Sequence, residues 1–274
     1  MMKRTLSRLA LALPAIALIA MPADAHRRWL LPSATVLSGD HETVSVDAAT
    51  GNSLFNFDHH ALGLDDLAIT GPDGKLVTPD IIGKGKYRSV FDVPLDEQGT
   101  YRIALASEGM FGTYMLNGER KRWRGSAADA KAQIPAGASE VKLTPVISRV
   151  ETFATLGAPN ETALAPTGRG IEMVPGTHPN DLVAGEGATM TFLKDGKPAQ
   201  GLDIEFVKGG TRYRDDAGVV HLTTDAEGQV VLNASEPGMY YLETSNGDPR
   251  VEGGGAADGG VRMSYAAVLE FLPG

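Results

Sequence analysis

Histidine is the residue type in this chain best suited to chemistry, because a neutral imidazole nitrogen binds transition metals near neutral pH. The sequence holds six histidines and no cysteine. Without thiolates, any metal would be held by histidine nitrogen, an amine, carboxylate oxygen or methionine sulfur. This donor set favours nickel, cobalt, copper, zinc or iron. Four of the histidines fall between residues 26 and 60, namely His26, His41, His59 and His60.

The N-terminal segment predicts that His26 becomes the first residue of the mature protein. Residues 1–25 have basic side chains at positions 3, 4 and 8, an apolar run over residues 9–21, and an Ala-Asp-Ala tripeptide at 23–25. These are the parts of a secretory signal peptide cleaved after Ala25, and the apolar run is too short to span a membrane. Cleavage would let His26 offer one metal ion two nitrogens, the α-amine and Nδ1. We therefore expect export to the periplasm.

A second group of candidate ligands is the run Asp58-His59-His60. In an extended segment neighbouring side chains point to opposite faces, so Asp58 and His60 would share a face that His59 would not. In a loop, His59 and His60 could bind one ion together. With His26 and His41, these residues predict a mixed nitrogen and oxygen site that suits tetragonal copper(II) or nickel(II), or tetrahedral zinc.

The same residues allow other interpretations. His41, His59 and His60 could be surface histidines in polar loops that hold no metal. His178, which precedes a proline, could be a hydrogen-bonded residue at a domain junction, and His221 a surface residue of a strand. The chain also lacks the G-x-S-x-G, H-E-x-x-H and P-loop motifs, so we expect no enzyme. A copper oxidase with an N-terminal histidine brace is the weaker alternative.

The charge balance excludes several classes of partner. The 274 residues include 25 Lys+Arg and 34 Asp+Glu, for a formal net charge of −9. Removing residues 1–25 takes away three basic residues and one acidic residue, which leaves 22 Lys+Arg, 33 Asp+Glu and a net charge of −11. A chain this acidic is not a nucleic-acid binder. We also expect no integral membrane segment after the signal peptide, because no later apolar run is long enough.

Alternating polar and apolar residues predict short β-strands along most of the mature chain. Residues 43–47 and 87–93 alternate in this way, and turns rich in glycine, proline and aspartate follow such runs. We predict an all-β protein of two β-sandwich, immunoglobulin-like domains, at 26–155 and 177–274, joined by a linker at 156–176. Similar acidic-glycine turns precede Tyr101 and Tyr240, which suggests that the halves are structural repeats. Residues 109–134 lack strand periodicity, and 127–132 could form a helical turn.

Three blocks of the sequence resemble a family of periplasmic bacterial proteins that is catalogued as a domain of unknown function, DUF4198. The blocks are the mature start His26-Arg27-Arg28-Trp29-Leu30 with Pro32-Ser33, the segment from Ile171 to Leu182, and Gly209 to Arg214 with Thr224 to Gly228 and Pro237 to Tyr240. Together they span nearly the whole mature chain. The resemblance implies two β-sandwich domains and a role linked to nickel and cobalt uptake, with His26 as a ligand.

We therefore expect an exported protein that binds a divalent transition metal (nickel, cobalt, copper or iron, with zinc also possible) in support of metal uptake. Its expected partners are components of a metal uptake transporter. The alternative is a module without metal, whose sandwich faces bind a partner protein or an envelope polymer. The predicted metal ligands are His26, His41, Asp58, His59 and His60.

Overall fold

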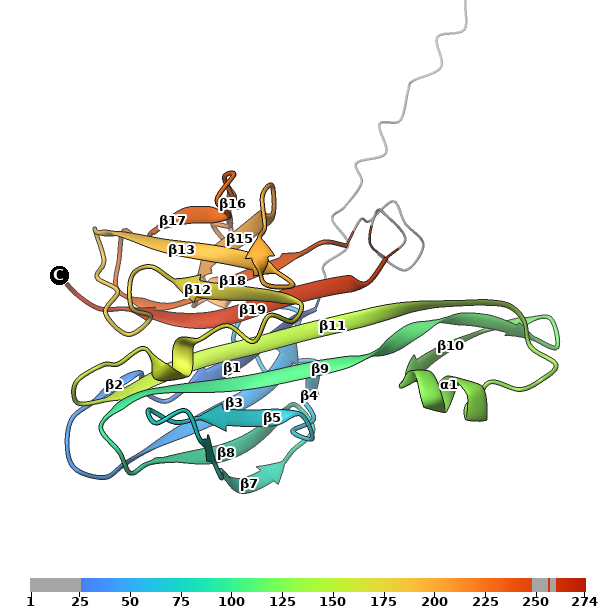
Figure 1. The fold of residues 1–274 in the computed structure, drawn as a ribbon, viewed down its shortest axis with the longest axis horizontal. Helices are drawn as coiled ribbons and strands as arrows, with labels where there is room; N and C mark the ends of the chain where they lie inside the picture. The colour runs from blue at the N-terminus through green and yellow to red at the C-terminus, as the bar shows by residue number, and fades with distance from the viewer. Residues whose placement is uncertain (1–25, 248–255, 257–259) are drawn as a thin grey trace, which may run out of the picture.

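The structure, a computed structural model, describes residues 26–247, 256 and 260–274. The predicted signal peptide lies outside the described residues. The described chain is all-β with a single short α-helix, as predicted, and its strands form three sheets stacked in layers (Figure 1). No helix in the described part of the chain is both long enough and apolar enough to cross a membrane.

The first sheet contains β1, the first strand of the described residues. Its hydrogen-bonded order is β1-β3-β8-β7, and β4 pairs with β3. In β3, Val44 and Val46 point into the core while Thr43 and Ser45 face solvent, as the sequence alternation predicts. The strands are β1 (Arg27–Pro32), β3 (Glu42–Gly51), β4 (His60–Ala61), β7 (Asp80–Lys84) and β8 (Arg88–Leu95).

The second sheet is the middle layer and contains strands from both halves of the chain. Its order is β16-β15-β18-β19-β11-β9-β5-β6, with β10 on β9 and β2 on β11. The two halves join where β11 pairs with β19 in parallel. The strands are β2 (Val36–Leu37), β5 (Leu67–Thr70), β6 (Leu76–Val77), β9 (Gly99–Leu116), β10 (Glu119–Gly125), β11 (Ser139–Leu156), β15 (Asp203–Lys208), β16 (Val220–Thr223), β18 (Gly238–Ser245) and β19 (Arg262–Phe271).

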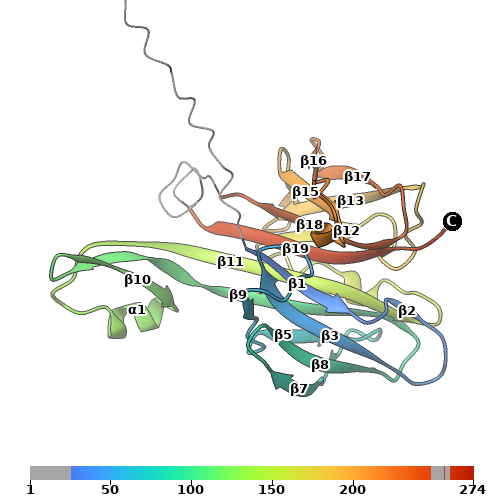
Figure 2. The same cartoon turned by 180° about the vertical axis from the view of Figure 1, so that it is seen from behind.

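The third sheet covers the other face of the middle layer, on the side opposite to the first sheet (Figure 2). It pairs β12 with β13, and β13 with β14 and β17. The strands are β12 (Ile171–Pro175), β13 (Gly187–Lys194), β14 (Lys197–Pro198) and β17 (Gln229–Asn233). Two 3-10 turns, η1 (Thr162–Leu164) and η2 (Thr211–Tyr213), connect strands. The segment predicted as a linker, 156–176, thus contains η1 and β12.

Two hydrophobic cores lie on opposite faces of the middle sheet. Strand β19 supplies both, because Tyr265 and Leu269 point into the core beneath the third sheet while Ala266 and Val268 point into the core beneath the first. Side chains of a strand alternate between faces, so a strand buried on both sides serves two sandwiches. The two predicted sandwiches are therefore layers that share one central sheet.

The turns before Tyr101 and Tyr240 have the same geometry. The hydroxyl of Tyr101 donates to the carbonyl of Glu97, and that of Tyr240 donates to the carbonyl of Glu236, both at 2.9 Å. Gly99 and Gly238, which open the two strands, have φ values of 131° and 135°, a backbone region that favours glycine. Each is a tyrosine corner of the kind that immunoglobulin-like sandwiches use.

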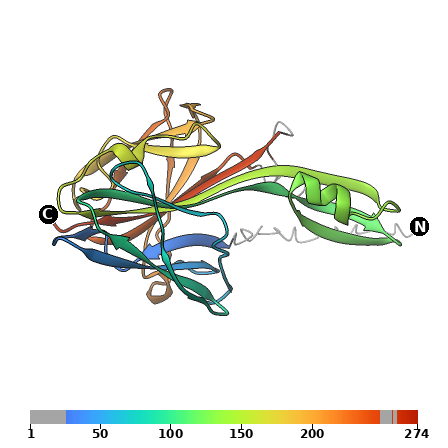
Figure 3. The same ribbon diagram turned by 60° about the horizontal axis from the view of Figure 1, so that its bottom comes forward.

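Strands β9 and β11 continue beyond the sandwich as a long hairpin that carries β10 and α1 (Ala127–Gln133); Figure 3 shows this arm projecting from the body. The segment 109–134 was predicted to have no strand periodicity, and it forms two strands. The side chains of the outer arm are exposed or half-buried on both faces, so no inward face imposes alternation. The predicted helical turn is confirmed as α1, which Ser126 and Asp129 cap reciprocally.

Candidate metal centre and the adjoining groove

His26 lies directly before β1, which holds this segment in place. All six residues of β1 pair with β3, from Arg27 opposite Gly51 to Pro32 opposite Val46. The Trp29 side chain is fully buried, and its ring meets the edge of Phe55 with centroids 5.8 Å apart. A segment fixed by pairing and by a buried aromatic ring does not fray, so the position of His26 beside it is defined.

Ion pairs fix the same segment from the other side. The guanidinium of Arg27 bonds to the carboxylate of Glu205 at 2.9 Å and to that of Glu243 at 3.2 Å. Both acids belong to the middle sheet, to β15 and β18. Strand β1 is therefore attached to two of the three layers.

Three of the predicted ligands come together at this end of the first sheet. The rings of His26 and His59 stack with centroids 3.8 Å apart and an interplanar angle of 20°. The rings of His59 and His60 lie 4.6 Å apart at 65°. His59 sits in a bend just before β4, so the loop interpretation applies, and His59 and His60 do not point to opposite faces.

The β-ladder explains how this grouping arises. Thr50 of β3 pairs with Arg28 on one side and with His60 on the other. His26 precedes β1 and His60 begins β4, so both lie at the same end of β3. Burial, followed by the charges of His59, His26, Lys84 and Arg124, lowers the pKa of His60 below its usual 6.5. A lowered pKa keeps the imidazole lone pair free for a metal at more acidic pH.

The structure does not bring His41 to this group. His41 precedes β3, whereas the other histidines lie at its far end, and ten residues of strand span roughly 30 Å. The exposed imidazole of His41 pairs with Asp96 at 3.3 Å. The structure therefore groups His26, His59 and His60 without His41, because the length of β3 separates residues that are near in sequence.

Asp58 is near the group but its carboxylate is already engaged. One oxygen accepts a hydrogen bond from the Asn52 backbone at 2.8 Å, and the other accepts one from the Asn56 side chain at 3.1 Å. Asp58 thus holds the loop that presents His59 and His60. Over the described residues, no set of three or more His, Cys, Asp or Glu side chains is arranged to enclose a metal ion.

His178 is a hydrogen-bonded junction residue, as one interpretation of the sequence predicted. Its Nδ1 accepts a bond from the Asn180 backbone at 3.2 Å, and its Nε2 lies 3.0 Å from Thr100 Oγ1. Burial lowers the pKa of His178, and the Asn160 carbonyl partly opposes that effect. His221 is exposed on β16 and lies 3.4 Å from Asp203.

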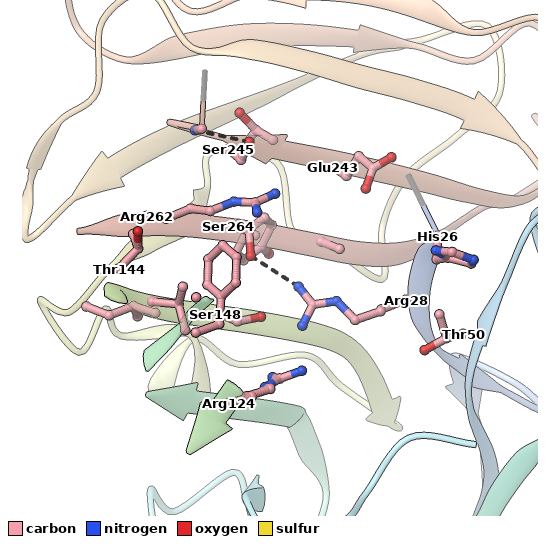
Figure 4. A pocket seen from close by; sticks show the side chains of 18 of the residues that line it. His26, Arg28, Thr50, Arg124, Thr144, Ser148, Glu243, Ser245, Arg262 and Ser264 are labelled. Atoms are coloured by element: carbon pink, nitrogen blue, oxygen red, sulfur yellow. Dashed lines mark hydrogen bonds between the residues drawn. The ribbon is translucent and has the colours of Figure 1, made fainter. Parts of the chain in front are cut away.

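A large groove adjoins the histidines. It has a volume of about 1260 Å³ and is bounded by β1, the base of the arm and strands β18 and β19. His26 and His60 line it at one end, and Arg28, Arg124 and Arg262 project into it, as Figure 4 shows for the residues that it labels. The sequence shows the basic run at 120–124, but not that distant arginines would converge with it.

The sequence profile of a family described as "Domain of unknown function (DUF4198)" matches residues 23–248. The chain belongs to the DUF4198 family. The resemblance drawn from the sequence blocks is thereby confirmed, and the match covers most of this DUF4198 chain. No curated protein matches it.

Solved structures give weaker likenesses. The D0-D1 domain of Intimin is 11% identical to this DUF4198 chain, over 89% of this chain and 97% of that one, with a TM-score of 0.21. An Escherichia coli alpha-2-macroglobulin activated by porcine elastase is 12% identical, over 91% of this chain and 31% of that one, also with a TM-score of 0.21. Scores this low carry no argument, so the fold rests on the strand pairings above.

Proposed function

We propose that this protein is exported to the periplasm and binds a divalent transition metal ion at its mature N-terminus, in support of metal uptake. The candidate metals are nickel, cobalt, copper, iron and zinc. The metal is cargo, and the protein is a binding protein rather than an enzyme. The observation that carries the proposal is the stacking of His26 on His59, with His60 beside them, at a chain end fixed by β1.

The chemistry of these donors fits the proposed cargo. Cleavage after Ala25 would free the α-amine of His26, which with Nδ1 of the same residue closes one chelate ring. His59 and His60 supply further imidazoles within reach, and all three side chains are exposed to an arriving ion. Nitrogen-rich sites of this kind favour nickel and copper, and they also suit cobalt and zinc.

Delivery is the second part of the proposal. Components of a metal uptake transporter would receive the ion from this site. A site at the edge of the first sheet, formed by exposed rings, can release an ion to such a partner more readily than a buried site. Release is also tied to proton uptake, since imidazole must be neutral to bind a metal.

The test uses protein exported with its own N-terminal segment and purified after processing. Intact mass should first confirm that the chain begins at His26. Calorimetric titrations with nickel, copper, cobalt and zinc then compare the wild type with His26→Ala. We expect tight binding of at least one metal by the wild type, and loss of affinity of about tenfold or more in the variant.

The matched control is His41→Ala, which removes an exposed histidine at the other end of β3. This variant should bind metal as the wild type does. Equal loss in both variants would show that binding is spread over surface histidines. No binding by the wild type would contradict the proposal and favour the alternative of a module that binds a protein or an envelope polymer.

A further inference from the structure

The groove beside the histidines is basic in an acidic protein. Three acids line it, Asp203, Glu205 and Glu243, and Arg27, which lies outside the lining, bonds to two of them. Against these acids stand six cations in the lining, Arg28, Arg120, Arg122, Arg124, Lys142 and Arg262. Gathering so much positive charge in one cleft of a chain with net charge −9 creates a local field that attracts anions.

Arg28 stands at the centre of this charge. Within the described residues Arg28 forms no ion pair, and its Nη2 donates one hydrogen bond, to Ser264 Oγ at 3.1 Å. Burial, together with the charges of Arg124 and Arg262, lowers its pKa, although Tyr241 and Glu243 act the other way. The three guanidiniums line the same groove, so an anion bound between them would offset their mutual repulsion.

The histidines lie in the same groove. His26 and His60 line one end of it, and Arg124 is near enough to His60 to act on it electrostatically. A bare divalent cation that approaches these rings is therefore repelled by the arginines beside them. A metal that arrives inside an anionic complex is attracted instead.

We propose that the groove takes the metal as an anionic carboxylate chelate, with the metal at His26 and His60 and carboxylate oxygens of the chelator on Arg28, Arg124 and Arg262. This inference rests on the function proposed above and names the substrate class of the same site. Carboxylates bind both transition metals and guanidinium groups, the latter through paired hydrogen bonds. A volume of about 1260 Å³ also far exceeds what one ion needs, since a water molecule takes up roughly 30 Å³.

The test compares nickel(II) alone with equimolar nickel(II)–citrate as ligands of the processed protein, by calorimetry. The wild type is compared with the double variant Arg122→Gln/Arg124→Gln, which removes two exposed cations of β10. The matched control, Lys131→Gln/Lys197→Gln, removes two exposed cations outside the lining. Circular dichroism and thermal midpoints establish that all three proteins are equally folded.

We expect the wild type and the control to bind nickel–citrate about tenfold more tightly than nickel alone, and the groove variant to lose that advantage while it still binds nickel alone. Nickel–citrate affinity equal in the groove variant and the wild type would overturn the inference. The inference would also be overturned if citrate removed nickel from the wild type. In that case nickel binding itself would still support the proposed metal carrier. No nickel binding in either form would contradict both proposals.

Discussion

The imidazole rings of His26 and His59 lie face to face, with their centroids 3.8 Å apart. One ring belongs to the residue directly before β1 and the other to the bend directly before β4, so tertiary structure brings them together. Two protonated rings at this distance would repel each other, whereas neutral rings can share a metal or stack. This pair is the structural basis of the proposed site.

The contribution of each histidine can be separated by single substitutions. We expect His59→Ala and His60→Ala each to weaken nickel binding by about tenfold, because each removes one imidazole from the group. His41→Ala should leave the affinity unchanged, since β3 separates it from the others. Nickel affinities from calorimetry test this order. If His41→Ala weakened nickel binding as much as His60→Ala does, the separation of His41 from the metal site would be contradicted.

Metal binding should depend on pH in a way that identifies His60. Protons compete with the metal for the same nitrogens, so affinity falls as the pH falls. Because burial and neighbouring charges lower the pKa of His60 below 6.5, its contribution should persist at pH 6.5 and decline only at lower pH. Nickel titrations of the wild type and His60→Ala between pH 7.5 and 5 measure that difference. If the wild type and His60→Ala bound nickel equally at pH 6.5, the lowered pKa of His60 would be contradicted.

Trp29 anchors the site, and its loss should destabilise the whole protein. The side chain is fully buried against Phe55 and Phe57, so Trp29→Ala should lower the free energy of unfolding by about 3–5 kcal/mol. Urea unfolding measures the loss. Trp123→Ala is the control, because that half-buried residue lies on the arm, and a much smaller cost is expected. If Trp29→Ala and Trp123→Ala lowered the free energy of unfolding equally, the role of Trp29 in anchoring β1 would be contradicted.

The two tyrosine corners allow a matched test of the fold. The Tyr101 hydroxyl donates to Glu97 O and accepts from Glu97 N, whereas the Tyr240 hydroxyl makes only the bond to Glu236 O. At about 1 kcal/mol for each hydrogen bond, Tyr101→Phe should cost about 2 kcal/mol and Tyr240→Phe about 1 kcal/mol. Tyr213→Phe, at an exposed position, should cost nothing measurable in urea unfolding. A larger loss of stability for Tyr240→Phe than for Tyr101→Phe would contradict the difference in hydrogen bonding.

His178 should make stability fall in mild acid. Its pKa is lower in the folded state than the usual 6.5, so the unfolded chain takes up the proton first as the pH falls. The free energy of unfolding contributed by His178 is therefore present above pH 6.5 and declines as the pH falls through 6.5 toward the folded pKa. Urea unfolding from pH 7.5 to 5.5 should show a shallower decline for His178→Gln. Parallel curves for the two proteins would contradict the linkage.

Much of the fold could be predicted where one face of a strand is buried. The alternation at Val44 and Val46 predicted β3, and the similar acidic-glycine turns before Tyr101 and Tyr240 do have matching geometry. The arm could not be predicted in the same way, because both of its faces meet solvent and no periodicity results. The parallel pairing of β11 with β19 was also hidden, since it joins segments far apart in the sequence.

The candidate site was predicted in part. The histidines between residues 26 and 60 are concentrated enough to be noticed, and His26, His59 and His60 do lie together. His41 lies apart from the other histidines, and position along the sequence does not reveal which end of a strand a residue occupies. The guanidiniums of Arg28, Arg124 and Arg262 come from β1, β10 and β19, so no local pattern could have predicted the groove.

The central claim, that the free amine of His26 binds the metal, is tested most directly by moving that amine. Inserting Gly-Ser-Gly between Ala25 and His26 keeps every imidazole but takes the α-amine out of chelate reach. We predict that the processed, extended protein, its start confirmed by mass, binds nickel about tenfold or more weakly than the protein that begins at His26, with the same thermal midpoint. Equal nickel affinity in the two proteins would contradict the claim.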